Sequence, residues 1–333
     1  MTAKTVRWGI IGCGDVTEVK SGPALAKAQH SALVGVMRRD ANAAADYARR
    51  HGVPRWHDDA DAILQAPDID AVYVATPPST HREYVLRCAE AGKPVLVEKP
   101  MALDGAQCDD MIDACRRMHV PLWVAYYRRA LPRFLAVRDL IADGAIGEVR
   151  MVTSRQIQPL RSASTTYGRS PPWRIDPAAS GGGLFVDMMS HTLDFLDFLF
   201  GPIASARGFA SNVAGAYRAE DVVCATYRFA NGVHGTGAFC YAGDRDDECN
   251  EIIGSGGRIR FSTTRPVPIE LCRGEVTEAI AIGDPPHVHQ PLVQCIVDEL
   301  NGTGTCPSTG ESAARTTRVI DTILHDFRAL NLQ

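Results

Sequence analysis

The stretch that decides the fold of this chain is Gly9-Ile10-Ile11-Gly12-Cys13-Gly14-Asp15-Val16-Thr17. A β-branched run over 6–11 leads into it and predicts a strand, and the pattern over 16–29 predicts a helix. Gly12 permits the tight turn between them, and Gly14 lets the backbone approach a pyrophosphate at the helix N-terminus. An ordinary strand-to-helix turn is the alternative. We predict a dinucleotide-binding loop made by Gly12, Cys13, Gly14, Asp15 and Val16.

Short apolar runs alternate with helical patterns through the N-terminal part of the chain. Strands are predicted at 33–37, 70–76, 95–97 and 122–126, and helices at 41–51, 80–91 and 104–119. This alternation is typical of βαβ units, in which helices cover parallel strands. We therefore predict an α/β domain with a doubly wound parallel sheet over residues 1–124.

After residue 125 the pattern changes to strand-like segments joined by turns. Asn231-Gly232 and Gly256-Gly257 are hairpin signals between such segments. Residues 125–333 should form an α+β domain with a large, open-faced, mostly antiparallel sheet, and its C-terminal helix can pack back on the first domain. Helices are expected at 131–143, 184–200, 291–300 and 311–330. Strands are expected at 149–157, 204–212, 222–229, 235–241, 252–254, 258–262, 267–272 and 276–282.

Composition excludes several classes of protein. The 333 residues include 35 Lys and Arg against 39 Asp and Glu, a net charge of −4, so nothing points to nucleic acid as a partner. Charged residues interrupt the apolar segment 184–200, so no membrane span is expected. The 10 Cys form no C-x-x-C pair and the first residues carry no apolar signal core, a combination typical of a cytoplasmic protein with reduced thiols.

The end of the second predicted strand bears on the choice of nucleotide. NAD sites place an acidic residue there, whereas NADP sites use Arg for the 2′-phosphate. Here the strand ends in Met37-Arg38-Arg39-Asp40, and Asp40 is better explained as the N-cap of the next helix. We expect Arg38 and Arg39 to favour NADP over NAD. The alternative is that both arginines are solvated surface charges.

Two further motifs carry chemistry. Lys99 follows a predicted strand, and ligands of open α/β sheets bind beyond the carboxyl ends of the strands. Asp187, His191 and Asp194 stand at i, i+4 and i+7 of a predicted helix and so share one face. A His beside a carboxylate one turn away keeps a defined tautomer and can act as a general base. The alternative is a polar helix stripe that faces water.

A series of motifs follows in order along the chain: Gly12-x-Gly14, Ala75-Thr76-Pro77-Pro78-Ser79-Thr80-His81, Glu98-Lys99-Pro100, Trp173-Arg174, and Gly181-Gly182-Gly183 leading to Asp187-x-x-x-His191. Together they resemble the glucose–fructose oxidoreductase, inositol dehydrogenase and rhizopine-catabolism (Gfo/Idh/MocA) family over essentially the whole chain. The resemblance implies an N-terminal Rossmann domain and a C-terminal sheet domain, often buried in a homodimer or homotetramer. It also implies NAD(P)-dependent hydride transfer to or from a carbinol or carbonyl carbon of a sugar, cyclitol or related polyol.

The resemblance also implies roles for individual residues. Lys99 and His191 are expected to act on the reacting oxygen, with Asp187 orienting His191. In reduction, Lys99 stabilises the charge that develops on oxygen, and His191 or Lys99 itself delivers the proton. Further contacts with the cofactor are expected from Thr76, Pro77, His81, Glu98, Lys99, Trp173 and Arg174.

The substrate side has weaker signals. The irregular segment 159–174 is rich in hydroxyls, arginines and aromatics, which suits either a polyhydroxylated ligand or an ordinary surface loop. His287 and His289 have no third ligand at suitable spacing, so no metal is predicted. The candidate substrate contacts are Tyr126, Tyr127, Arg128, Trp173 and His289.

Two other functions fit the same motifs. One is an NAD-dependent glycosidase that oxidises its substrate transiently, and the other is a non-catalytic regulator that senses a dinucleotide. The presence of Lys99, Asp187 and His191 favours an enzyme, an NAD(P)-dependent dehydrogenase or reductase acting on a CH–OH group.

Overall fold

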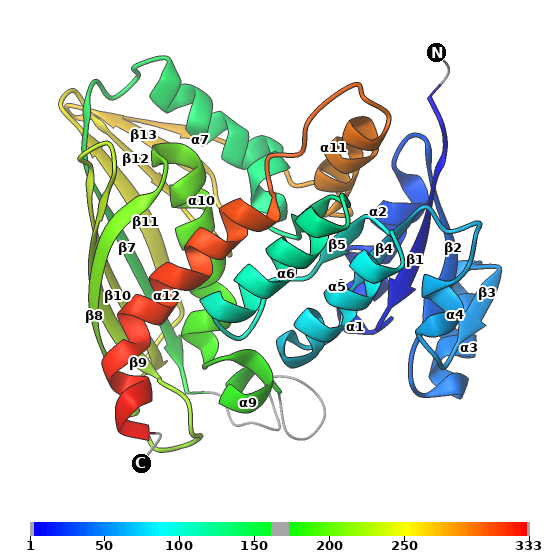
Figure 1. Ribbon diagram of the computed structural model, residues 1–333. Helices are drawn as coiled ribbons and strands as arrows, with labels where there is room; N and C mark the ends of the chain where they lie inside the picture. The colour runs from blue at the N-terminus through cyan, green and yellow to red at the C-terminus, as the bar shows by residue number, and fades with distance from the viewer. Residues whose placement is uncertain (1–2, 161–172, 332–333) are drawn as a thin grey trace. The chain divides into compact units, whose positions relative to one another are not determined.

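A computed structural model of the chain describes residues 3–160 and 173–331 (Figure 1). The chain forms two compact units. The first comprises Met1–Ala102, Ala106–Leu131 and Asp284–Ala314, and the second comprises Leu103–Gly105, Pro132–Gly283 and Arg315–Gln333. The segment Asp284–Ala314, near the C-terminus, therefore belongs to the same unit as the N-terminal part of the chain.

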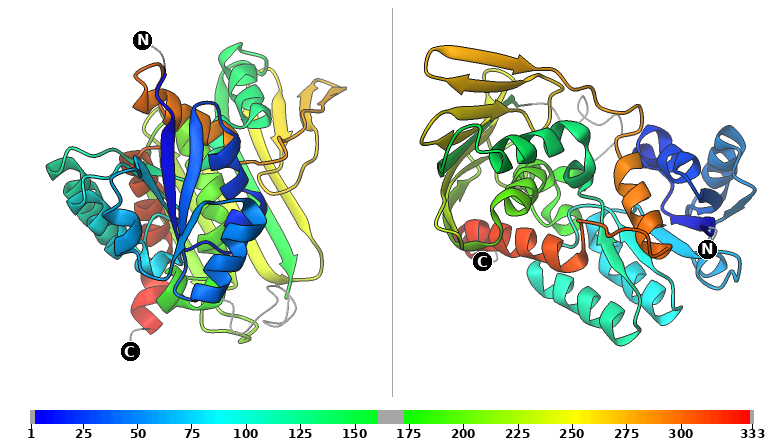
Figure 2. Two further views of the ribbon diagram at one scale, coloured as in Figure 1. Left: turned by 90° about the vertical axis from the view of Figure 1, so that its right-hand side faces the viewer. Right: turned by 90° about the horizontal axis from the view of Figure 1, so that it is seen from above.

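The first unit is built on a six-stranded parallel sheet in the order β3-β2-β1-β4-β5-β6, with helices on both faces (Figure 2). β4 and β5 are buried at every residue because helices cover both of their faces. Ligands of such sheets bind beyond the carboxyl ends of the strands where the order reverses, here between β1 and β4. The strands are β1 (Val6–Ile11), β2 (Ser31–Met37), β3 (Arg55–His57), β4 (Ala71–Val74), β5 (Val95–Val97) and β6 (Leu122–Val124).

The prediction of a single helix over 16–29 is wrong, because the structure has two short helices there. α1 (Asp15–Val19) ends before α2 (Gly22–Lys27) begins, and Pro23 occupies the first turn of α2, where a missing N–H costs nothing. The other helices of this unit are α3 (Ala41–His51), α4 (Asp61–Leu64), α5 (His81–Glu90), α6 (Gly105–Arg117) and α11 (Gln290–Leu300), with short 3-10 turns η1 (Pro78–Thr80) and η2 (Tyr127–Ala130).

The second unit contains an eight-stranded sheet in the order β14-β13-β12-β11-β7-β10-β9-β8. Only β7 and β10 pair in parallel; the other neighbours are antiparallel. The predicted fold class is therefore confirmed. The strands are β7 (Val149–Pro159), β8 (Ile203–Ser211), β9 (Val222–Phe229), β10 (His234–Gly243), β11 (Asp247–Gly254), β12 (Arg258–Phe261), β13 (Ile269–Arg273) and β14 (Val276–Ile280).

Helices α7 (Pro132–Ala142), α10 (Ser190–Phe200) and α12 (Gly310–Asn331) lie along one face of this sheet (Figures 1 and 2). Strand β9 alternates between buried and exposed residues, as expected of a sheet with one covered face. The short elements η3 (Trp173–Ile175) and α9 (Pro177–Ser180) precede the glycine run at 181–183. No helix within 3–160 and 173–331 is long and apolar enough to cross a membrane.

Candidate active site

The glycine loop has the geometry that a dinucleotide needs. Gly12 has a φ of +92°, and a Cβ there would stand 2.6 Å from Thr76 Cγ2, so a larger residue would be both strained and crowded. A Cβ on Gly14, by contrast, would find its nearest atom 3.9 Å away. Gly14 is the N-cap of α1, whose first N–H groups are available to an anion. Open space at this helix N-terminus fits a pyrophosphate.

Thr17, which stands where the fingerprint has its third glycine, closes this loop. Its Oγ1 accepts from the N–H of Gly14 at 3.0 Å and donates to the carbonyl of Gly14 at 2.7 Å. The hydroxyl of Tyr47 on α3 donates to the Thr17 carbonyl at 2.8 Å. The side chain of Cys13 is buried, and burial raises the pKa of its thiol to about 11. Cys13 can therefore offer a ligand only its backbone.

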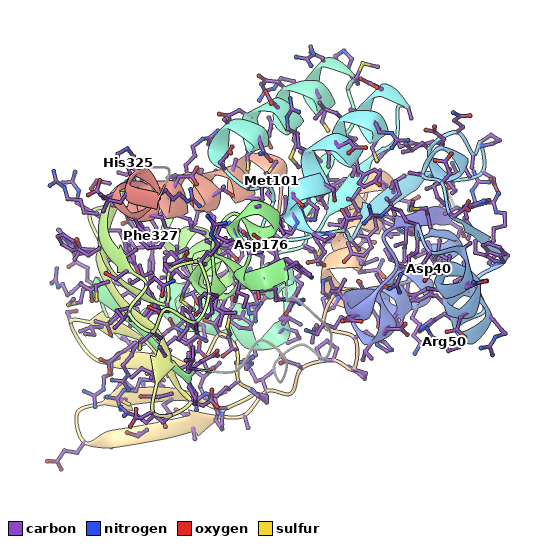
Figure 3. The ribbon with its side chains drawn as sticks, turned by 90° about the horizontal axis from the view of Figure 1, so that it is seen from below. Asp40, Arg50, Met101, Asp176, His325 and Phe327 are labelled. Carbon is purple, nitrogen blue, oxygen red and sulfur yellow. The ribbon has the colours of Figure 1, made fainter. Side chains whose placement is uncertain are left out.

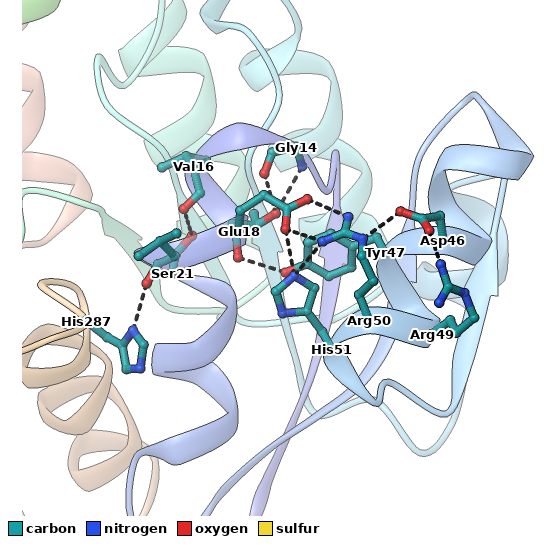
Figure 4. Close-up of polar contacts among 12 residues, drawn as sticks. Gly14, Val16, Glu18, Ser21, Asp46, Tyr47, Arg49, Arg50, His51 and His287 are labelled. Atoms are coloured by element: carbon teal, nitrogen blue, oxygen red, sulfur yellow. Dashed lines mark hydrogen bonds and ion pairs between the residues drawn. The ribbon is translucent and has the colours of Figure 1, made fainter.

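A second set of contacts ties α1 to α3 (Figure 4). Glu18 on α1 accepts from Arg50 at 2.6 and 2.8 Å, and its carboxylate lies 2.7 Å from Nε2 of His51. The hydrogen bond from Arg50, aided by His51, lowers the pKa of Glu18 to about 2. The helix that follows the glycine loop and the helix that follows β2 are therefore held together.

At the end of β2 the structure confirms that Asp40 is the N-cap of the next helix. Arg38 and Arg39 are exposed, and Asp40 uses its carboxylate to accept from the N–H of Ala43 at 3.0 Å. Asp40 thus caps α3, the helix that leads from Asp40 towards Arg50 (Figure 3). Arg38 and Arg39 are exposed at the point where a ribose is expected, and the exposed Asp40 beside them is engaged as the cap.

His81, a predicted cofactor contact, has no exposed atom. Its Nε2 lies 2.7 Å from the carbonyl of Thr76, and its Nδ1 lies 3.1 Å from the carbonyl of Pro100. The ring therefore joins the turns that follow β4 and β5. Within this unit it positions Thr76 and Pro77 rather than presenting a surface of its own.

Glu98, next to Lys99, is the centre of a buried polar cluster. Its Oε1 accepts from the hydroxyl of Tyr73 and lies 3.0 Å from Nε2 of His289, and its Oε2 accepts from the Lys99 N–H at 3.1 Å. Burial raises the pKa of Glu98. The hydrogen bonds of His289 and Tyr73 and the charges of His289 and Lys99 outweigh this effect and lower the pKa to about 2. Glu98 is therefore an anion. We call Tyr73, Glu98, Lys99 and His289 the Lys99 cluster.

Two more of the predicted substrate residues, Tyr127 and Arg128, pack beside His289 of this cluster. The ring of Tyr127 lies 4.4 Å from the ring of His289, and the guanidinium of Arg128 lies 4.9 Å from the Tyr127 ring. Tyr126, Tyr127, Arg128 and His289 are all buried. The structure gives them packing contacts within the first unit, and their contact with substrate stays a prediction.

In the second unit, Asp187 and His191 lie on a helix that is not regular. η4 (Phe185–Met189) is a π-helical turn that contains Asp187, and α10 continues it from Ser190 with His191 in its first turn. We call residues 185–200 the catalytic helix. The i, i+4 spacing predicted a single α-helix, but the same spacing is compatible with a wider turn. π-turns are frequent at functional sites.

Most polar residues of the catalytic helix do not face water, although Asp187 is partly exposed. His191, Asp194 and Asp197 are buried, which excludes the solvated stripe as an explanation. Asp197 accepts from Arg315 on α12 at 2.6 and 2.9 Å. Buried charged and polar side chains are retained where they have partners or a function.

Trp173 and Arg174 are brought to Asp187. Arg174 Nε lies 3.5 Å from Asp187 Oδ2, and its guanidinium lies 4.4 Å from the Trp173 ring. Asp176 follows and caps α9 through the N–H of Ala178 (Figure 3). The remaining part of the predicted substrate loop, 161–172, lies outside the described residues. Lys99 and His191 belong to different units, and their joint role stays a prediction.

Two polar features were missed in the sequence. The contact between Glu98 and His289 joins residues that are 191 positions apart, so no local pattern could reveal it. Glu220 is buried and accepts from the N–H of Gly183 at 2.8 Å. The only signal was a Glu-Asp pair immediately before a predicted strand.

These features define a dinucleotide-binding enzyme with a separate sheet domain. Residues 6–126 match the model of the oxidoreductase family with an NAD-binding Rossmann fold, and residues 134–260 match the GFO/IDH/MocA C-terminal domain. The chain therefore belongs to the GFO/IDH/MocA family of oxidoreductases, as the motifs suggested.

Known proteins resemble the chain along most of its length. It is 36% identical to an oxidoreductase of Formosa agariphila over 95% of this chain and 97% of that protein. It is 32% identical to an inositol 2-dehydrogenase of Rhizobium meliloti over 81% of this chain and 80% of the relative. The structure of an oxidoreductase from Agrobacterium radiobacter in complex with NAD+, L-tartaric acid and magnesium superposes with a TM-score of 0.84 at 20% identity, covering 99% and 98% of the two chains.

Proposed function

We propose that the protein is an NAD(P)-dependent dehydrogenase or reductase that acts on a CH–OH or carbonyl carbon of a sugar, cyclitol or related polyol. The observation that carries the proposal is the family match over both domains in a chain that retains Lys99, Asp187 and His191. The similarity to an inositol 2-dehydrogenase supports a polyol as substrate.

The nicotinamide dinucleotide supplies or accepts the hydride when bound. In this proposal the α1 N-terminus and Gly14 hold its pyrophosphate, and Lys99 stabilises negative charge on the substrate oxygen. His191 moves the proton to or from that oxygen. Asp187, which is paired with Arg174, orients His191.

We also propose a preference for NADP(H). Arg38 and Arg39 are exposed at the end of β2, and Asp40, the one acidic residue there, is engaged in capping α3. Replacing both arginines by Ala should raise the KM for NADP+ roughly ten- to a hundred-fold, the value of one or two charge-assisted hydrogen bonds, with little change for NAD+. Arg49→Ala, on the exposed side of α3, is the matched control. Equal loss with both cofactors contradicts the assignment.

A homodimer or homotetramer through the second sheet completes the proposal. Phe209 on β8 is 84% exposed and pairs in register with the exposed Cys224 on β9. Gly208 contacts Ile323 of α12, so Phe209 faces the other side of the sheet. Light scattering should report more than one chain for the native protein and a smaller assembly for Phe209→Asp.

The experiment that tests the function is a panel of polyols, aldoses and keto-sugars, each with NAD+ and NADP+ or their reduced forms, followed by nicotinamide absorbance. Stoichiometric change in absorbance with an alcohol or ketone supports the proposal. Cleavage of a glycoside without net absorbance change indicates the glycosidase instead. Tight nucleotide binding with no turnover across the panel indicates the regulator.

A further inference from the structure

The catalytic helix begins without a capping side chain of its own. Leu184, which precedes η4, makes no side-chain cap, and Gly182 and Gly183 have no side chain to offer. The first N–H groups of any helix lack partners within it. Because Phe185 and Val186 are buried away from water, a hydrogen-bond acceptor for the N–H groups at this end of the helix must come from the protein itself.

Glu220 supplies that acceptor from a distant part of the chain. Its Oε1 accepts from the N–H of Gly183, in the turn just before the helix, at 2.8 Å, and the Val186 N–H inside the helix also favours its charged form. The neighbouring Asp221 accepts from the N–H groups of Val213 and Ala214 at 2.7 and 2.8 Å. Those contacts fix the loop that delivers Glu220 to the helix.

The glycine run before the helix is shaped by this contact. A Cβ on Gly182 would stand 3.2 Å from Glu220 Oε1, and a Cβ on Gly183 would stand 2.7 Å from the Glu220 carbonyl. On the other side of the run, Arg328 on α12 donates to the carbonyl of Gly181 at 2.6 Å. The turn that starts the catalytic helix is thus held between α12 and Glu220.

We propose that Glu220 is a positioning residue for the reaction: its carboxyl caps the catalytic helix and so sets where Asp187 and His191 stand. The inference rests on the proposed function, because it assumes that those two residues act on substrate. Asp187 lies in the π-turn next to the cap, so loss of the cap should displace Asp187 before it displaces His191.

If Glu220 acts through its charge, kcat should change with pH as Glu220 gains or loses its proton. A simple packing role would not cause this change. Burial raises the pKa of Glu220 to about 7, although hydrogen bonds from backbone N–H groups and the charge of Arg328 act in the opposite direction. Tyr241 on β10 is a titratable group of the sheet that interacts electrostatically with both Glu220 and Asp187. Near neutral pH the cap exists in a charged and a neutral form, and the charged form accepts the stronger hydrogen bonds.

The test compares Glu220→Gln, Glu220→Ala and the exposed control Glu278→Ala. Glu220→Ala should lower kcat roughly ten-fold with a smaller change in KM, because one charge-assisted hydrogen bond is lost. Glu220→Gln keeps an acceptor oxygen and should recover most of that loss, but its kcat should no longer change with the ionisation near pH 7. Glu278→Ala should match the native protein.

Hydrogen exchange of the native protein and the variants gives a readout without substrate. Amides in peptides covering 183–192 should exchange at least several-fold faster in Glu220→Ala, with little change over β11. Unchanged exchange over 183–192 overturns the inference, even if the enzyme panel succeeds. If the panel fails while exchange rises, the cap stands and the proposed function falls. Where Glu220→Ala does not fold, a native pH profile in Glu220→Gln overturns the inference.

Discussion

Two buried glutamates stand beside the predicted catalytic residues, and they behave in opposite ways. Glu98 in the Lys99 cluster is 7% exposed and Glu220 at the catalytic helix is 1% exposed. Burial raises the pKa of both. The pKa of Glu98 nevertheless falls to about 2, whereas that of Glu220 rises to about 7.

The difference lies in their partners. Glu98 meets His289, the Tyr73 hydroxyl and the charge of Lys99, while Glu220 meets mainly backbone N–H groups. N–H dipoles compensate burial less than a cation does. Glu98 therefore supplies a permanent negative charge next to Lys99. Glu220 supplies a cap whose charge depends on pH.

The largest expected effects come from the residues that these glutamates support. Lys99→Ala and His191→Ala should each lower kcat/KM at least about 100-fold, because each removes proton transfer or charge stabilisation in the transition state. Lys4→Ala and the α12 surface variant His325→Ala (Figure 3) are the matched controls and should stay near the native value. If either variant keeps the native kcat/KM, the residue replaced in it takes no part in the mechanism.

A smaller effect is expected on stability at the Lys99 cluster. His289→Leu should lower the free energy of unfolding by roughly 3 kcal/mol, because it leaves the Glu98 carboxylate buried without its partner. The double variant with Glu98→Leu should regain part of that loss. Urea denaturation followed by Trp fluorescence measures both. If His289→Leu is as stable as the native protein, Glu98 is not held as an anion by His289.

The last effect is spread over several pH units and is therefore small at each step: a pH dependence of stability with opposite sign in the two regions. The folded pKa of Glu220 lies above its ordinary value of 4.5, so its contribution is present below pH 4.5 and is lost as pH rises through about 7, by up to roughly 3 kcal/mol. Glu220→Gln should lose less stability than the native protein between pH 5 and about 8. The pKa of Glu98 is lowered, so its contribution is lost only as pH falls from 4.5 towards about 2. Parallel curves for the native protein and Glu220→Gln contradict the assignment.

Much of the first unit could be predicted from local patterns. The strand, the glycines and the helix that form the nucleotide loop are adjacent in sequence, and Asp40 is the N-cap that its position suggested. The break between α1 and α2 was missed although Pro23 signals it. α2 buries Ala24 and Leu25, whereas α1 buries only Thr17 and leaves Val19 exposed, so the two helices do not share one apolar face.

The contacts that hold the site could not be predicted in the same way. The predicted contact of His289 with substrate stays a prediction, but no local pattern indicated that its ring lies 3.0 Å from Glu98. The Asp187 and His191 spacing predicted one helical face, but it could not distinguish an α-turn from a π-turn. Partners that approach from other elements decide such features, and their distance along the chain hides them.

The sequence by itself determined the fold class, the nucleotide loop and the family, because these rest on residue types at short, fixed spacings. Only the tertiary structure decided which buried carboxyl stays charged and which one titrates near neutral pH. The pKa of a buried group depends on the few atoms that surround it. Here those atoms come from β4, β5 and the segment before α11 for Glu98, and from the start of the catalytic helix for Glu220.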